Sequence, residues 1–132
     1  MEREVTLKLI QEVCKQDERV VFAYAYGSFT HGKSFRDIDI GIYVKGTEEN
    51  SFAITSDIKI ALSHKAKKRG LNFTSDQFDV KILNEAPFTF MIRIFKEGIL
   101  LVDHDPHLRT DLVEHVSLKY RECAGLLSEA SL

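Results

Sequence analysis

The stretch "AYAYGSFTHGKSFRDIDIGIYV", residues 23–44, joins two apolar runs through a Gly-Ser turn and a polar loop. The second run alternates strictly, which is typical of a strand with one buried face: Asp37 and Asp39 share one face, and Ile38, Ile40, Ile42 and Val44 share the other. Two carboxylates about 4 Å apart repel by roughly 4 kcal/mol at an effective dielectric near 20. A positive charge is therefore expected between the two aspartates.

The remainder of the chain predicts helices and strands in alternation. Residue spacing and end signals predict helices over about 2–16, between the segment "GTEENS" and Gly70, from Pro87 to Gly98, and from Asp105-Pro106 onward. Apolar and alternating runs predict strands at 20–26, 37–45, 77–84 and 99–103. This order indicates one α/β domain over residues 1–132, with a small mixed sheet flanked by helices.

Three of these helices have apolar stripes that should face the core. The first stripe contains Val5, Leu9 and Val13, with Ile10 and Cys14 beside them; the second contains Ile54, Ile58, Ala61 and Leu62; and that of the last helix contains Leu112, Val116, Cys123 and Leu127. Cys14 and Cys123 are too few and too far apart for a disulfide framework, so two buried free thiols are expected.

Composition narrows the class of protein. The chain has 44% hydrophobic and 29% charged residues and a formal net charge of −2, whereas general nucleic-acid or membrane-surface binding depends on large positive fields. No apolar run approaches the ~20 residues of a membrane span. We therefore expect a cytoplasmic protein that binds neither membrane nor nucleic acid directly.

The quoted stretch also contains the elements of an anion site. Gly27 and Ser28 end a buried strand, and a helical turn starting at Phe29 would point its positive end at a bound anion. Asp37 and Asp39 lie on one face of the following strand, within reach of one Mg²⁺, which prefers carboxylate and phosphate oxygens. Asp79, on a further strand, could join them if the two strands are neighbours.

The run "YGSFTHGKSFRDIDIGIYV" resembles the signature of the nucleotidyltransferase superfamily related to DNA polymerase β. "FDVKILNEAP", followed by a helix ending in "KEGILLVD", is similar to the minimal nucleotidyltransferase (MNT) group. The resemblance extends roughly from Val20 to Asp103 and rests on several separated motifs.

The resemblance implies a role for each matching position. Gly27 and Ser28 would hold the β- and γ-phosphates of a nucleoside triphosphate such as ATP. Asp37 and Asp39 would bind the catalytic Mg²⁺, and Asp79 would complete the metal site and help to activate the attacking hydroxyl.

The loop before Asp37 departs from the family pattern. It has only eight residues, 29–36, fewer than is usual in the family, and Arg36 stands where relatives often have a small polar residue. Lys33 and Arg36 are additional candidates for contacts with the nucleotide phosphates.

The absence of further domains for base and acceptor in the sequence implies that a second protein, or a second copy, completes the cleft. In the MNT group this companion is commonly a helical HEPN-type toxin, so the leading hypothesis is an antitoxin that transfers AMP to a tyrosine of such a toxin. Two alternatives stay open: neutralisation of a partner by contact alone, and nucleotidyl transfer to a small-molecule hydroxyl.

Overall fold

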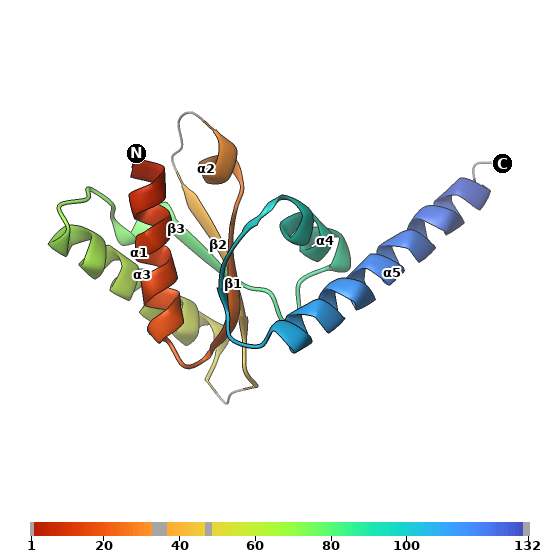
Figure 1. Ribbon diagram of the computed structural model, residues 1–132, viewed down its shortest axis with the longest axis horizontal. Coiled ribbons are helices and arrows are strands. Elements are labelled where there is room, and N and C mark those ends of the chain that lie inside the picture. The colour runs from red at the N-terminus through yellow and green to blue at the C-terminus, as the bar shows by residue number, and fades with distance from the viewer. Residues whose placement is uncertain (1, 33–36, 47–48, 131–132) are drawn as a thin grey trace.

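The structure is a computed structural model that describes residues 2–32, 37–46 and 49–130. Figure 1 shows helices packed around a central sheet. The elements are α1 (Glu2–Gln16), β1 (Val20–Tyr26), α2 (Ser28–His31), β2 (Ile38–Val44), α3 (Ser51–Lys68), a 3₁₀ turn (Ser75–Gln77), β3 (Phe78–Ile82), α4 (Phe88–Glu97), β4 (Ile99–Asp103) and α5 (Pro106–Ala130). The predicted α/β class with a mixed sheet is confirmed.

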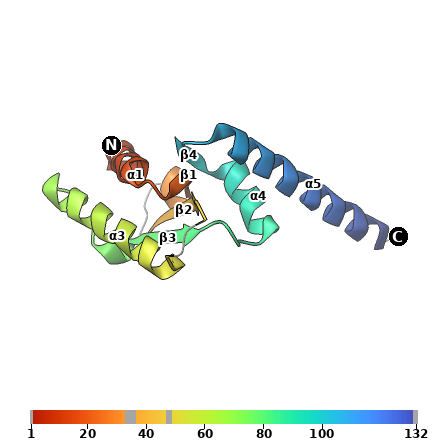
Figure 2. The same cartoon turned by 90° about the horizontal axis from the view of Figure 1, so that it is seen from below.

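The sheet has the strand order β3-β2-β1-β4. The central strand β1 is antiparallel to both β2 and β4, whereas β3 is parallel to β2. A parallel neighbour requires a crossover connection, and α3 provides it. Figure 2 shows that α1 and α3 cover one face of the sheet while α4 and α5 cover the other.

Each face of the sheet has its own apolar cluster. On the α1–α3 side, aliphatic side chains of β2 such as Ile40 pack against Leu9 and Ile58. The α4–α5 side is aromatic: the Phe22 ring stacks on Tyr43 with centroids 5.1 Å apart. β1 is buried on both faces over most of its length, as its continuous apolar run predicts.

Some predicted core positions are wrong. Val5 is 42% exposed, and the neighbouring Thr6 is fully buried in its place. In α3, Ala61 is exposed whereas Ala66 is buried. In both helices the face that meets the sheet is thus turned slightly from the stripe predicted by spacing alone.

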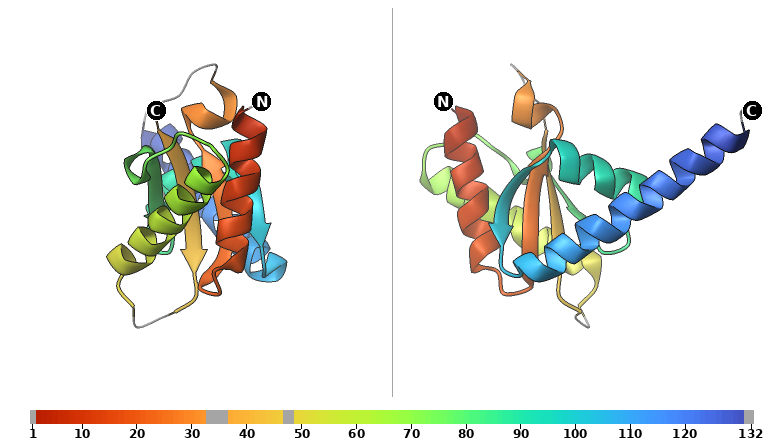
Figure 3. Two further views of the ribbon diagram at one scale, coloured as in Figure 1. Left: turned by 90° about the vertical axis from the view of Figure 1, so that its left-hand side faces the viewer. Right: turned by 45° about the vertical axis from the view of Figure 1, so that its right-hand side comes forward.

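The two cysteines differ in environment. Cys14 is buried, as predicted, and burial raises the pKa of its thiol to about 12. Cys123 is only half-buried, so the prediction of two buried thiols is wrong for this residue. The reason is visible in Figures 1 and 3, where the later turns of α5 extend beyond the sheet and α4.

The helix ends agree with the predicted end signals. The side chain of Asn50, within "GTEENS", accepts a hydrogen bond from the backbone N–H of Ala53 at 2.8 Å at the start of α3. Gly70 follows α3 with a positive φ of 73°. Asp105 Oδ1 accepts a bond from the Leu108 N–H at 3.0 Å and caps α5.

No described helix combines the length and apolar character needed to cross a membrane. The cytoplasmic setting expected from the sequence stays a prediction.

Asn84 extends the β2–β3 pairing beyond the end of β3. The N–H of Val44 donates to Asn84 Oδ1 at 2.9 Å, and Asn84 Nδ2 donates to the Val44 carbonyl at 2.8 Å. This pair of bonds fixes the chain between β3 and α4 to the last residue of β2.

We predict that Asn84→Ala lowers the free energy of unfolding by about 1 kcal/mol. Two hydrogen bonds of ordinary strength are lost, and the N–H and carbonyl groups of Val44 then bond to water instead. Urea denaturation measures this change. Asn72→Ala, at an exposed position between α3 and β3, is the control and should change stability by less than about 0.5 kcal/mol. Equal effects of the two variants would contradict a structural role for Asn84.

Candidate functional site

The end of β1 and the starts of β2 and β3 meet at one end of the sheet. Tyr26, the last residue of β1, is the pairing partner of Asp39, and Asp39 is in turn the partner of Asp79 on β3. Residues directly opposite each other on paired strands have their side chains on the same face. The three side chains are therefore neighbours, and the condition that the strands of Asp39 and Asp79 be adjacent is met.

Gly27 allows the chain to pass directly over Asp39. Its φ of 79° and ψ of −163° lie in a region that essentially only glycine adopts. A methyl group at this position would overlap Asp39 Oδ2. The backbone at the end of β1 is thus in close approach to the carboxylate, as expected where a ligand is cradled by main-chain groups.

The α2 turn is anchored on the side away from solvent. Phe29 is fully buried, and the Arg3 guanidinium of α1 donates to the Phe29 carbonyl at 2.9 Å and also to the Gly32 carbonyl. The Thr30 hydroxyl donates to the Gly27 carbonyl at 2.8 Å. These contacts fix the backbone that follows the strand, and Arg3 is a contributor that local sequence patterns do not reveal.

Its surroundings disfavour the charged form of the Asp39 carboxylate. Partial burial raises the pKa of Asp39, and the nearby charge of Asp79 raises it further; Lys81 opposes both effects. A bound cation would remove this penalty, because an opposite charge within a few ångströms favours the ionised carboxylate.

The residues fit a hard divalent cation of the Mg²⁺ type. Such an ion is usually held by one or two carboxylates together with substrate phosphate oxygens, and Asp39 and Asp79 supply two adjacent carboxylates. Among the described residues, no group of three or more His, Cys, Asp or Glu side chains is arranged to hold a metal. Asp37, exposed and one residue before β2, stays a predicted ligand.

The predicted phosphate-binding residues divide into two groups. Gly27 and Ser28 lie at the described turn, where Ser28 is exposed and begins α2, one residue earlier than expected. Lys33 and Arg36 lie outside the described residues, so their predicted contacts stay predictions.

A hollow of about 230 Å³ opens beside Asp39. Gly27 and Asp39 form part of its wall, and the other side chains that line it include four that sequence reasoning did not select: Tyr26, Lys81, Phe90 and Arg93. One signal was present for Lys81, which is two residues beyond Asp79 on the same strand and so shares its face. The residues from α4 had no such signal, because only the fold brings that helix to the carboxylates.

Tyr26 is unusual among the residues of this hollow. Its hydroxyl is buried and has no hydrogen-bond partner in the described structure. Burial raises the pKa of Tyr26, and the charges of Asp39 and Asp79 raise it further, so the hydroxyl stays protonated and able to donate.

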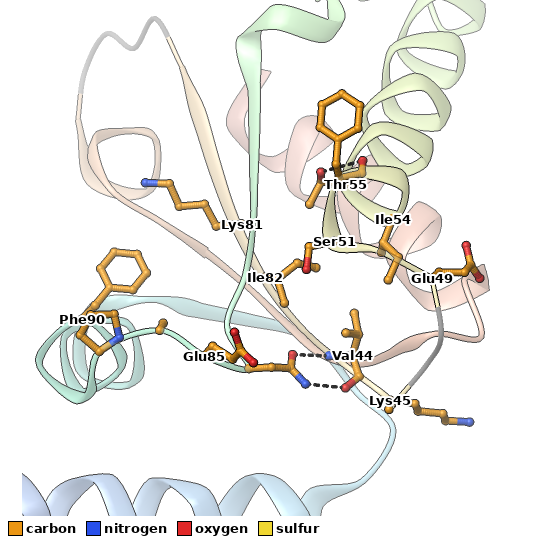
Figure 4. Close-up of a pocket in the computed structure, with 15 residues that line it drawn as sticks. Val44, Lys45, Glu49, Ser51, Ile54, Thr55, Lys81, Ile82, Glu85 and Phe90 are labelled. Atoms are coloured by element: carbon orange, nitrogen blue, oxygen red, sulfur yellow. Dashed lines mark hydrogen bonds between the residues drawn. The ribbon is translucent and has the colours of Figure 1, made fainter.

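A larger hollow of about 760 Å³ adjoins the first. Figure 4 shows it between the start of α3 and the start of α4, with Lys81 and Phe90 at one end and Lys45 at the other. Lys81 and Phe90 line both hollows. The carboxylate pair is therefore next to a space large enough for part of a nucleotide or of an acceptor.

The four-strand mixed sheet flanked by helices, with a Gly-Ser turn that passes over Asp39, is consistent with a nucleotidyltransferase fold. The chain belongs to the family described as "Polymerase beta, Nucleotidyltransferase", which matches residues 8–107. The predicted superfamily is confirmed. Comparison with curated protein sequences gives no match.

Solved structures with a similar fold come from toxin–antitoxin complexes. The chain is similar to one from the MntA–HepT toxin–antitoxin structure, at a TM-score of 0.62 and 13% identity, with 98% of this chain and 99% of that chain covered. The complex of a tri-AMPylated Shewanella oneidensis HEPN toxin with its MNT antitoxin gives a TM-score of 0.59 and 14% identity, over 98% and 99% of the two chains. A toxin–antitoxin structure with AMP-PNP gives 0.57 and 16%, over the full length of both.

We predict that Gly27→Ala lowers the free energy of unfolding by at least about 2 kcal/mol, because a non-glycine residue is strained in this conformation and the added methyl group overlaps Asp39. Thermal or urea denaturation measures the loss.

Gly70→Ala is the matched control. Gly70 also has a positive φ, but a methyl group there would meet nothing within 4 Å, so only the conformational cost of about 1 kcal/mol remains. Equal losses for the two variants would show that the approach of Gly27 to Asp39 is not a tight contact.

Proposed function

We propose that this protein is a Mg²⁺-dependent nucleotidyltransferase that moves AMP from ATP to a hydroxyl group, and that the acceptor is a tyrosine of a HEPN-type toxin, which the protein neutralises as an antitoxin. One observation carries the proposal: in a chain of the nucleotidyltransferase family, Asp39 and Asp79 are paired side by side, and the Gly27 backbone passes over Asp39.

Each part of the site has a task in this reaction. Asp37, Asp39 and Asp79 would hold Mg²⁺, which supplies electrostatic stabilisation of the phosphates when bound. Gly27 and Ser28, with Lys33 and Arg36 from the loop, would hold the β- and γ-phosphates. The acceptor oxygen then attacks the α-phosphorus, the bond to the β-phosphate breaks, and pyrophosphate leaves.

Asp79 is the residue best placed to assist the acceptor. Its side chain is 45% exposed, and it lies on the edge strand β3. An incoming hydroxyl can therefore reach it from solvent and transfer its proton as the new bond forms.

The identity of nucleotide and acceptor is supported by the similar structures. One of them contains an AMPylated HEPN toxin beside its MNT antitoxin, and another contains AMP-PNP. In this chain Asp79 is partly exposed on the edge strand β3, so a bound partner could present a side-chain hydroxyl directly to the carboxylates.

We predict that Asp39→Asn lowers AMP transfer roughly 100-fold or more, because one charge that stabilises the reacting phosphates is removed. The measurement is transfer of label from α-labelled ATP, with Mg²⁺, in a mixture with the co-encoded helical partner protein. Label should appear on a tyrosine of that partner, and chelation of Mg²⁺ should abolish it.

Asp111→Asn, which removes the same charge from the exposed surface of α5, is the control and should retain full transfer. Absence of label on any protein with the unaltered chain would contradict the enzymatic proposal. If Asp39→Asn stops labelling but still neutralises the partner, contact alone is the biological function. Labelling of a small molecule in place of the partner would mean that the acceptor is a small-molecule hydroxyl and not a tyrosine of the partner.

A further inference from the structure

Lys81 occupies a position that the fold alone does not require. It lies on the edge strand β3, its side chain is 53% exposed, and its Nζ is 3.8 Å from Asp79 Oδ2. That separation is longer than a hydrogen bond, so the ion pair leaves the donors of the ammonium group available. Exposed pairs of this kind add little stability.

Phe90 restricts where the Lys81 ammonium group can lie. The Nζ is 5.6 Å from the centroid of the Phe90 ring, in a cation–π contact. The same ring packs edge-on against Tyr26, with centroids 5.6 Å apart. Lys81 and Tyr26 are therefore joined through one α4 side chain, on the wall of the hollow beside Asp39.

The buried hydroxyl of Tyr26 provides a second, independent observation. A buried donor without a partner costs about 1–3 kcal/mol, and Tyr26 carries such a group at the residue directly opposite Asp39 in the sheet. A ligand that brings an acceptor oxygen into this hollow would satisfy it.

The other charges of the hollow do not exclude an anion. Glu97 contributes a carboxylate to the wall, but it forms an i,i+4 ion pair with Arg93 at 3.6 Å, which offsets its charge. Lys81 thus adds positive charge on the α4 side of the carboxylate pair.

We propose that Lys81 and Tyr26 bind the phosphate group attached to the nucleoside, Lys81 by charge and Tyr26 as a hydrogen-bond donor, and that Phe90 positions Lys81. This inference rests on the proposed function. The reacting phosphate must lie at Asp39 and Asp79, and Lys81 follows Asp79 on the strand farthest from β1 and its Gly27-Ser28 turn. In the proposed function the leaving pyrophosphate would lie at that turn, two strands away from β3, although Gly27 and Lys81 both line the smaller hollow.

The first test compares two probes in the presence of Mg²⁺: α,β-methylene-ATP, which cannot transfer AMP, and inorganic pyrophosphate. Lys81→Met should weaken binding of the nucleotide roughly tenfold, the loss expected for a charged hydrogen bond, and should change pyrophosphate binding less than twofold. Lys81→Arg should restore most of the nucleotide affinity. Isothermal titration calorimetry measures all of these.

Lys15→Met is the matched control. Lys15 is exposed in the last turn of α1, on the opposite face of the sheet from α4 (Figure 2), so the same loss of charge there should leave both affinities unchanged. Equal weakening of nucleotide and pyrophosphate by Lys81→Met, or no weakening of either, would overturn the proposal.

Tyr26→Phe separates binding from stability. Removing a buried hydroxyl that has no partner should leave the melting temperature unchanged or raise it, whereas nucleotide affinity should fall several-fold. A lower melting temperature with unchanged affinity would mean that the hydroxyl serves the fold and would remove Tyr26 from the proposal.

These outcomes are distinguishable from failure of the proposed function. If the unaltered chain binds neither probe, the nucleotidyltransferase proposal fails, and this inference fails with it. If the unaltered chain binds the nucleotide but transfers AMP to nothing, the affinities of the Lys81 and Tyr26 variants still decide the inference.

Discussion

The parallel pairing of β2 with β3 is the constraint on which the site depends, because it places Asp39 directly beside Asp79. The negative charges of these two neighbouring carboxylates repel each other, and this repulsion opposes the pairing of the two strands. The pairing is maintained elsewhere: α3 makes the crossover, apolar residues such as Val80 fill the opposite face, and Asn84 continues the contact beyond the strand. Packing on the α1–α3 face of the sheet thus stabilises a strand pairing that keeps two carboxylates close together on the other face.

The carboxylate pair is useful because the neighbouring elements leave it partly uncovered. Gly27 brings the backbone over Asp39 without a side chain in the way, and α4 adds aromatic and basic groups beside it. β3 is an edge strand, and its residues Lys81 and Ile82 form part of the wall of the larger hollow. The arrangement suits a reaction in which one substrate is held by the sheet end and the other is presented by a second molecule.

Much of the fold could be predicted because strand alternation and helix-end signals are local. Asp39 and Asp79 could be selected from local sequence as well, because each lies in an alternating strand and aspartate is disfavoured in strands. What could not be predicted depends on contacts between distant segments: the order of the strands, the anchoring of α2 by Arg3, and the approach of Phe90 to Lys81. The same limit explains why Val5 was wrongly predicted to face the core: periodicity defines an apolar stripe on a helix but not the angle of that stripe to the sheet.

The central claim is that the paired carboxylates and the Gly27 turn together form the nucleotide-binding site. A crystal structure of the chain with α,β-methylene-ATP and Mn²⁺ in place of Mg²⁺ tests it most directly, because the anomalous signal locates the ion independently of the nucleotide. The account predicts an Mn²⁺ peak in contact with Asp39 and with a phosphate oxygen, beside the Gly27 turn. Nucleotide bound elsewhere, or an ion that contacts neither carboxylate of the pair, would contradict it.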